Sequence, residues 1–266
     1  MRILLNSYYN PCDNTLHGTH IAGFYSCINQ LRISLYVLAS EGILPTALTL
    51  QETLHWYKEE YSAVDYYPIL YKIDQVNEKS IGEKFNFNVF CPNSINYNAY
   101  EFEKLLPIET RYFSPSIDVT NNVARLISKY NISPNNTLAV FHRGTDKGSE
   151  VTLKSFEYWL SMVESKLDTD NKILIQTDDV EFKEGFVKHF GDRCFTFDEM
   201  VFDNKHVKPT DAHKTWVINY ESIVRIIALC KKIIVHTGNG GLIPIIYRKH
   251  AQNVTQLCSN GVFVSY

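Results

Sequence analysis

The sequence predicts an α/β protein in which strands and helices alternate, and two observations lead to this prediction. Short apolar runs such as residues 137–142, 172–176 and 232–237 have the length of buried strands, and each ends in polar residues. The segments between them carry apolar residues at helical spacing. This alternation is typical of an open parallel sheet with helices on both faces.

The first third of the chain predicts a strand, a helix, a strand and a second helix. Residues 2–6 form a short apolar run that predicts the first strand. Residues 24–38 carry apolar side chains at alternating spacings of four and three, which is one face of a helix, and Gly42 stands where a C-terminal capping glycine belongs. Residues 43–50 predict the next strand and residues 51–60 another helix.

The middle of the chain is less regular. Residues 66–73 are apolar and aromatic enough for a strand, and residues 77–98 are Asn-rich without a clear period, which predicts loops. A helix is expected to start between residues 93 and 100 and to run through residue 106. We expect Pro107 and Pro115 to bracket a connection between two domains, residues 1–115 and residues 116–266.

The second domain predicts a regular alternation of elements. The expected helices are residues 119–130, 152–167, 180–189, 220–231 and 242–249. The expected strands are residues 137–142, 172–176, 194–197, 232–237 and 261–265. Ser116 or Asp118 is expected to cap the first of these helices, and Asp179 the third.

Length, composition and charge set the broad class of protein. The chain has 266 residues, of which 45% are hydrophobic and 21% charged, as in an ordinary globular protein of one or two domains. The net charge of −3 argues against a dedicated nucleic-acid binder, which carries a basic face. No apolar run approaches the roughly 20 residues of a bilayer helix, and the N-terminus does not resemble a signal peptide. Six scattered cysteines without a CxxC motif fit reduced thiols, so we expect a cytoplasmic protein with no integral membrane segment.

Polar residues follow three of the predicted strands at the point where each strand ends. They are residues 142–150 (HRGTDKGSE), 177–179 (TDD) and 237–241 (TGNGG). In open α/β sheets, ligands bind beyond the carboxyl ends of the strands. If the three strands are parallel neighbours, these clusters converge on one site.

Two of these clusters have the chemistry of an anion site. Arg143 directly follows a strand, and its forked guanidinium matches a phosphate group. The alternative for Arg143 is a structural ion pair with Asp146. The glycine-rich loop at 238–241 opens a helix, where exposed backbone amides bind anions, and its alternative is a tight strand-to-helix turn.

No set of residues predicts a metal site. Asp168 and Asp170 form a DxD pattern that can hold a metal on a nucleotide sugar, but the pattern follows a predicted helix and precedes a strand. It therefore lies at the opposite end of the sheet from the three clusters, and a hydrated turn is the better interpretation. The remaining His, Cys, Asp and Glu residues lack the spacing of metal ligands.

Taken together, the three clusters resemble the donor-binding motifs of the α1,6-fucosyltransferases and the related protein O-fucosyltransferases. Residues 142–147 (HRGTDK), followed by Glu150, are similar to the family's first motif, H-x-R-R-T-D-K with a later acid. Residues 175–184 resemble the second motif, a strand that ends in T-D-D before a helix, and residues 229–239 resemble the third. Two positions depart from the first motif, since Phe141 stands in place of the histidine and Gly144 in place of the second arginine.

The resemblance implies roles for individual residues. Arg143 would contact the donor's β-phosphate, and Glu150 would be a donor contact or the base that accepts the acceptor's proton. Asp146 and Lys147 would shape the phosphate site. The wider set of donor-binding residues implied by the motifs is His142, Asp146, Lys147, Asp178, Thr237, Gly238 and Asn239. Asp13, His17 and His20 are further candidates for the base, from the first domain.

The resemblance also implies a fold and an activity. The fold is GT-B, with two Rossmann-like domains that face each other across a cleft and the second holding the donor. The activity is inverting transfer of fucose from GDP-fucose to a hydroxyl of a glycan or glycoconjugate, with no metal and no cofactor besides this donor substrate. Two alternatives stay open: a glycosyltransferase that uses another nucleotide sugar, and a non-catalytic nucleotide- or glycan-binding protein of the same fold.

Overall fold

The chain divides into two compact units, each with its own sheet. The computed structural model describes residues 1–4, 6–54, 64–74, 96–99, 101–144, 152–169, 171–199 and 213–266. Unit 1 comprises Met1–Phe90, Tyr100–Asn122 and Lys208–Glu221, and unit 2 comprises Cys91–Ala99, Val123–Val207 and Ser222–Tyr266. The chain passes between the units within two helices, α4 (Ile117–Lys129) and α7 (His213–Leu229). Residues 116–122 and 213–221, which lie in the second domain if the chain divides after residue 115 as predicted, belong to unit 1.

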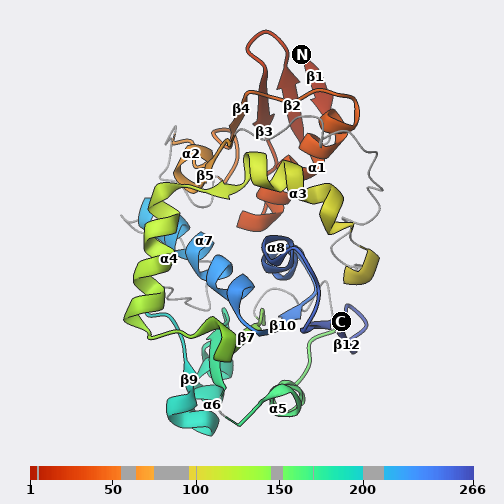
Figure 1. Ribbon diagram of the computed structural model, residues 1–266. Coiled ribbons are helices and arrows are strands. Elements are labelled where there is room, and N and C mark those ends of the chain that lie inside the picture. The colour runs from red at the N-terminus through yellow and green to blue at the C-terminus, as the bar shows by residue number, and fades with distance from the viewer. Residues whose placement is uncertain are drawn as a thin grey trace. The chain divides into compact units, whose positions relative to one another are not determined.

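Unit 1 contains a four-stranded sheet in the order β1-β2-β3-β4 (Figure 1). Its strands are β1 (Arg2–Leu4), β2 (Ser7–Asn10), β3 (Thr15–Gly18) and β4 (Ala47–Thr49). The first three are antiparallel neighbours, and β4 runs parallel to β3. The predicted strands at 2–6 and 43–50 are therefore present but shorter, whereas the β2–β3 hairpin was not predicted because its strands carry no long apolar run.

The first helix, α1 (Phe24–Ser40), confirms the helical spacing of its apolar residues. Those residues are buried, and Gly42 follows the helix with φ +77°, a conformation that glycine adopts without steric cost. The prediction of a helix from residue 51 is wrong for residues 51–54, which form turns, and the remainder lies outside the described residues.

Two predictions for the middle of the chain are wrong. The segment predicted as a strand at 66–73 is instead the short helix α2 (Tyr67–Leu70) followed by β5 (Tyr71–Lys72). Pro107 does not end an element but lies inside α3 (Phe102–Tyr112). Burial of Leu105, Ile108 and Tyr112 along one face of α3 compensates for the backbone hydrogen bond that the proline cannot make.

Unit 2 contains a six-stranded sheet in the order β12-β11-β10-β7-β8-β9. Its strands are β7 (Thr137–Phe141), β8 (Lys172–Gln176), β9 (Cys194–Phe195), β10 (Lys232–His236), β11 (Val254–Leu257) and β12 (Phe263–Ser265). All neighbours are parallel except β12, which is antiparallel to β11. The predicted parallel sheet is thus confirmed, and the strand that the prediction missed is β11, whose four residues include two polar ones.

Helices cover both faces of this sheet. On one face, α5 (Phe156–Lys166) and α6 (Val180–Phe190) pack Trp159 and Phe186 against Val140 and Ile175. On the other face, α8 (Asn239–Arg248) lies against the opposite side of β7 and β10, as Figure 1 shows. Side chains alternate between the two faces along a strand, so each central strand is buried from both sides.

The predicted caps of α4 and α6 and the predicted α4 helix are confirmed. The hydroxyl of Ser116 accepts the backbone N–H of Val119 at 3.2 Å, and α4 begins at Ile117. The carboxylate of Asp179 accepts the backbone N–H of Phe182 at 3.0 Å at the start of α6. In the part of the chain that the structure describes, every helix is too short or too polar to cross a membrane.

Candidate functional site

The carboxyl ends of three neighbouring strands bring the predicted polar clusters to one edge of the unit 2 sheet. Strand β7 pairs with β10 on one side and with β8 on the other, all in parallel. The pairs Val235–Phe141 and Phe141–Gln176 lie in register at this edge. Residues that follow these three strands are therefore within reach of a common ligand, as the sequence predicted.

Arg143 and Asp178, which follow β7 and β8, form the centre of this site. Arg143 Nε donates to Asp178 Oδ2 at 3.2 Å, and the backbone N–H of Gly144 donates to Asp178 Oδ1 at 2.8 Å. The Arg143 side chain is 28% exposed, whereas that of Asp178 is 13% exposed. Asp178 thus fixes part of the guanidinium, which stays partly exposed to an approaching anionic ligand.

The structure shows one ion pair of Arg143 and does not test the alternative considered from sequence. Asp146, the residue expected to pair with it in a structural salt bridge, lies outside the described residues. The observed partner comes from the neighbouring strand and is also one of the predicted donor-binding residues.

Gly144 has no room for a side chain. A Cβ at this position would lie 2.7 Å from Cε1 of His142 and 2.9 Å from Oδ2 of Asp179. Both neighbours are held, since Asp179 caps α6 and the His142 ring is buried. The structure therefore explains why glycine occurs here, where the resembled motif has a second arginine.

His142 lies behind Arg143 in the core rather than at the surface. Its ring stacks on Phe182 at a centroid distance of 3.8 Å and meets Trp159 edge to face. Its Nδ1 lies 2.8 Å from the hydroxyl oxygen of Thr177, which also accepts the backbone N–H of Asp179. Burial lowers the pKa of His142 to about 4, although the nearby carboxylates of Asp178 and Asp179 act in the opposite direction.

The buried His142 predicts a loss of stability in mild acid. Because its pKa is lower in the folded protein than in the unfolded chain, the unfolded chain binds the proton first as the pH falls. The stabilisation is complete above about pH 6.5 and is lost as the pH falls toward the folded value near 4. Because of this histidine, the free energy of unfolding is expected to be about 2 kcal/mol lower at pH 5 than at neutral pH.

Urea unfolding at pH 7.5 and pH 5.0 measures this effect. The variant His142→Phe keeps a ring against Phe182 and should lose less stability between the two pH values than the unsubstituted protein. His189→Gln, which removes an exposed histidine on α6, is the control and should behave as the unsubstituted protein. An equal loss in all three proteins would contradict the prediction.

Thr237, which follows β10, is held from the neighbouring strand. Nε2 of Gln256 donates to Oγ1 of Thr237 at 2.5 Å, and the hydroxyl of Tyr266 donates to Oε1 of Gln256 at 2.8 Å. Thr237 and Gln256 are both buried. This chain of hydrogen bonds fixes the point at which β10 leaves the sheet and turns into α8.

The start of α8 has the close backbone approach that its glycines predicted. Gly238 precedes the helix with φ +132°, which favours glycine, and Asn239 is the first helical residue. A Cβ on Gly241 would lie 2.0 Å from the carbonyl oxygen of His236. The glycines therefore serve the tight turn, and they also leave the first backbone amides of α8 at the same edge of the sheet as Arg143.

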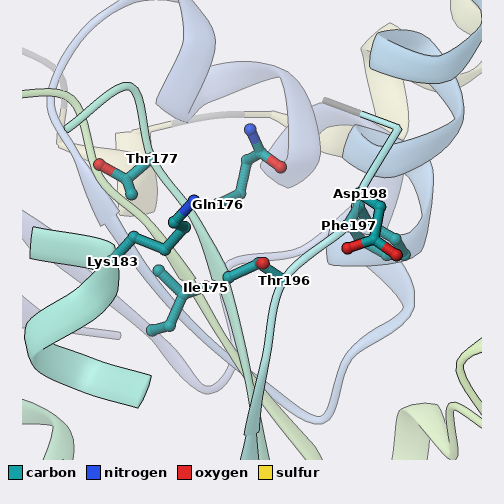
Figure 2. Close-up of a pocket in the computed structure, with 7 residues that line it drawn as sticks. All are labelled: Ile175, Gln176, Thr177, Lys183, Thr196, Phe197 and Asp198. Atoms are coloured by element: carbon teal, nitrogen blue, oxygen red, sulfur yellow. The ribbon is translucent and has the colours of Figure 1, made fainter. Parts of the chain in front are cut away.

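A cavity of about 200 Å³ opens beyond the ends of β8 and β9 (Figure 2). It is lined by Ile175, Gln176, Thr177, Lys183, Thr196, Phe197 and Asp198. Thr177 belongs both to this lining and to the hydrogen bonds around His142. The cavity therefore adjoins the site of Arg143 and Asp178, and its lining mixes apolar side chains with hydroxyl, amide, carboxylate and amine groups.

Several predicted residues are not tested by this geometry. Asp146, Lys147 and the proposed base Glu150 lie outside the described residues. In unit 1, His17 lies on β3 with its ring stacked on Tyr8, and Asp13 lies in the turn before β3. These roles remain predictions.

Asp168, the first residue of the DxD pattern, lies where the sequence predicted, at the opposite edge of the unit 2 sheet. Asp168 forms ion pairs with Lys231 at 3.3 Å and with Lys232 at 2.9 Å, and Lys232 is the first residue of β10. Hydrogen bonds from Lys232 and Lys231 lower the pKa of Asp168. Asp170 lies outside the described residues. Among the residues that are described, no three His, Cys, Asp or Glu side chains gather in a way that could hold a metal ion.

Comparison with solved structures identifies the fold. A NodZ α-1,6-fucosyltransferase co-crystallized with GDP matches 92% of this chain and 95% of its own, with 10% identity and a TM-score of 0.57. NodZ α-1,6-fucosyltransferase soaked with GDP-fucose matches 92% of this chain and 96% of its own, with 11% identity and a TM-score of 0.55. Fucosyltransferase NodZ from Bradyrhizobium matches with 10% identity and a TM-score of 0.54, over 92% of this chain and 95% of its own.

The chain has the fold of these fucosyltransferases. It is the mixed α/β fold of the GT-B type that the sequence resemblance implied. No family model matches the chain. No curated protein matches it either.

The sequence analysis gave no individual role to some residues of the site. Thr177 and Gln256 bind predicted residues through their side chains, and Phe182 supports the ring of His142. Thr177 begins the TDD cluster, so its place after β8 was a usable signal. Gln256 lies on the strand that the prediction missed, and no pattern in the sequence links it to Thr237.

Proposed function

We infer that this protein is a glycosyltransferase that transfers fucose from GDP-fucose to a hydroxyl of a glycan acceptor, with inversion and without a metal ion. One observation carries the proposal: Arg143 lies at the carboxyl edge of the parallel sheet, held by Asp178 and partly exposed, beside the strand that leads into α8. This arrangement occurs in a fold that is shared with NodZ structures co-crystallized with GDP or soaked with GDP-fucose.

The chemistry requires stabilisation of a leaving diphosphate. The acceptor oxygen forms a bond to the anomeric carbon while the bond from that carbon to the β-phosphate oxygen breaks, and the electron pair leaves with GDP. In this proposal, Arg143 and the first amides of α8 stabilise the negative charge that develops on this oxygen. The proton of the acceptor hydroxyl passes to a base, for which Glu150 is the candidate from sequence.

The cavity beyond β8 and β9 suits the nucleoside of such a donor. Its volume of about 200 Å³ accommodates a planar base, with Phe197 and Ile175 as apolar contacts. Gln176 and Asp198 supply the directional hydrogen-bonding groups that discriminate one base from another. A base in this cavity would leave the diphosphate to extend toward Arg143.

Thermal shift with a panel of nucleotides tests the proposal. GDP and GDP-fucose are expected to raise the melting temperature more than UDP or CMP at equal concentration. At one hundred times Kd, binding adds about 2.7 kcal/mol, which corresponds to a shift of roughly 5 °C or more.

The transfer assay is then run with GDP-fucose in the presence of EDTA, and activity is expected to persist. A larger shift with UDP than with GDP would indicate another nucleotide sugar. GDP binding with neither donor hydrolysis nor transfer would indicate a non-catalytic binding protein, and loss of activity in EDTA would contradict the metal-independent mechanism.

A further inference from the structure

One wall of the cavity lies outside the sheet. Residues 196–198 form this wall, whereas β9 ends at Phe195, where it pairs with Leu174. The opposite wall comes from the last residues of β8 and from α6, which hydrogen bonds and packing hold in place. Strand pairing does not hold residues 196–198. The width of the cavity therefore depends on other contacts of this segment.

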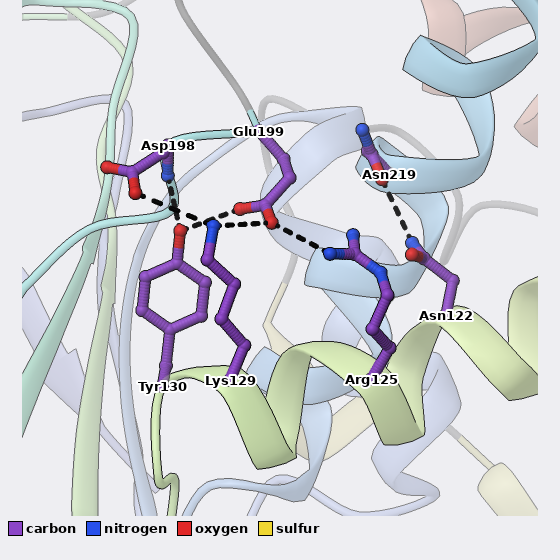
Figure 3. Close-up of polar contacts among 7 residues, drawn as sticks. All are labelled: Asn122, Arg125, Lys129, Tyr130, Asp198, Glu199 and Asn219. Atoms are coloured by element: carbon purple, nitrogen blue, oxygen red, sulfur yellow. Dashed lines mark hydrogen bonds and ion pairs between the residues drawn. The ribbon is translucent and has the colours of Figure 1, made fainter.

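Tyr130, which directly follows α4, holds this wall. Its hydroxyl donates to Oε2 of Glu199 at 2.7 Å and accepts the backbone N–H of Asp198 at 2.8 Å (Figure 3). Its ring meets Phe197 edge to face at a centroid distance of 5.0 Å and lies nearly parallel to the ring of Phe195. One side chain thus contacts two residues of the wall, Phe197 and Asp198, and the residues on either side of it, Phe195 and Glu199.

Glu199 completes the attachment to α4. Besides the Tyr130 hydroxyl, its carboxylate accepts hydrogen bonds from Lys129 at 3.0 Å and from Arg125 at 3.1 Å (Figure 3). Its side chain is 13% exposed, compared with 43% for Lys129 and 50% for Arg125. Burial by itself would raise the pKa of Glu199, but the hydrogen bonds from Tyr130 and Lys129 prevail and lower it to about 2.

We propose that Tyr130 and Glu199 act as a clamp that positions residues 196–198, and that this clamp sets the affinity and base selectivity of the cavity for the nucleoside of the donor. The proposal rests on the proposed function, because it concerns the same donor. Neither clamp residue lines the cavity, so both are positioning residues. The clamp contacts Phe197 and Asp198, and both residues line the cavity. Loss of the clamp lets Phe197 and Asp198 move away from the base without altering Arg143.

Tyr130→Phe is the informative variant, because it keeps the ring contacts and removes both hydrogen bonds of the hydroxyl. Glu199→Gln removes the charge at the other half of the clamp. Tyr158→Phe is a matched control, since it makes the same change on α5, where the ring stacks on Phe263. Calorimetry with GDP and with UDP gives the dissociation constants, and steady-state kinetics with GDP-fucose gives KM and kcat.

Tyr130→Phe and Glu199→Gln are each expected to raise Kd for GDP about fivefold to tenfold, the effect of about one lost hydrogen bond. The KM for GDP-fucose should rise similarly, while kcat stays within about twofold because Arg143 is unaffected. The ratio of the UDP to the GDP dissociation constant should fall toward one. The double variant should raise Kd by less than the product of the two single effects, since the two residues share one hydrogen bond.

The outcomes separate this proposal from the proposed function. If the unsubstituted protein binds GDP but Tyr130→Phe keeps its Kd and its selectivity, the clamp proposal is overturned while the donor assignment stands. A fall in melting temperature with unchanged Kd and selectivity shows a merely structural role and also overturns it. If the unsubstituted protein binds no nucleoside diphosphate, the proposed function fails and this role of the clamp fails with it. An equal rise of the Kd for GDP in Tyr158→Phe would also contradict the clamp proposal.

Discussion

Arg143→Ala is expected to reduce kcat/KM for fucose transfer by at least about 100-fold, the effect of removing a preorganised donor that stabilises charge in the transition state. In the proposed mechanism the guanidinium acts on charge that develops as the diphosphate leaves, so kcat should fall by a larger factor than the Kd for GDP rises. Steady-state kinetics and calorimetry on the same preparation measure the two effects.

The fold should survive this substitution. Asp178 keeps the hydrogen bond from the Gly144 amide, and the ion pair with Arg143 is partly exposed. We therefore expect the free energy of unfolding to fall by no more than about 1 kcal/mol. Circular dichroism and melting curves check that the loss of activity does not reflect unfolding.

Two further variants make the test specific. Arg143→Lys keeps a positive charge but loses the forked geometry, so it should recover little of the activity. Arg193→Ala removes another hydrogen-bonded arginine of unit 2, whose partners are the carbonyls of Asn171 and Asp168 at the opposite edge of the sheet. It should keep full activity. An active Arg143→Ala enzyme would refute the assignment of this edge as the donor site.

Gly241→Ala is expected to destabilise unit 2 by about 3 kcal/mol or more, at or beyond the upper end of the cost of overpacking. The added Cβ would lie 2.0 Å from the carbonyl oxygen of His236. That oxygen belongs to β10, a strand paired on both sides, so it cannot move away without breaking the sheet. The helix must shift instead, which also displaces the amides of α8 from the proposed diphosphate site.

Gly240→Ala is the matched control, one residue earlier in the same helix. A Cβ there would lie 3.6 Å from the ring of Phe141, an ordinary contact distance. Alanine favours the helix over glycine by about 1 kcal/mol, so this variant should be as stable as the unsubstituted protein or slightly more stable. Urea unfolding measures both variants, and equal stability of the two would contradict the steric argument.

Much of the unit 2 fold was predictable because its signals are local. Strands such as β7 and β8 are short apolar runs that end in polar residues, and the cap of α6 is a single aspartate. The failures occurred where tertiary packing outweighs local preference. Pro107 lies within α3 because buried apolar side chains stabilise that helix despite the missing hydrogen bond. Strand β11 has only four residues and is defined by its pairing with β10.

The site likewise has features that the sequence predicts and features that only packing decides. Its approximate location was predictable, since polar residues after three strands meet at one edge when the strands are parallel neighbours. The partner of Arg143 was not, because Asp178 is 35 residues away along the chain and is brought close by the pairing of β7 with β8. Folding likewise brings together two other pairs that are not neighbours in the chain, Gln256 with Thr237 and Tyr130 with Glu199.

The sequence by itself determined the alternation of elements, the three polar strand ends and the positions of Arg143 and the α8 glycines, since each depends on residues that are near one another in the chain. Only the tertiary structure decided which side chains hold these groups. Asp178 orients Arg143, the space beside His142 excludes any side chain at Gly144, and Tyr130 with Glu199 secures a cavity wall. Such contacts join distant segments, so they depend on how the whole chain packs.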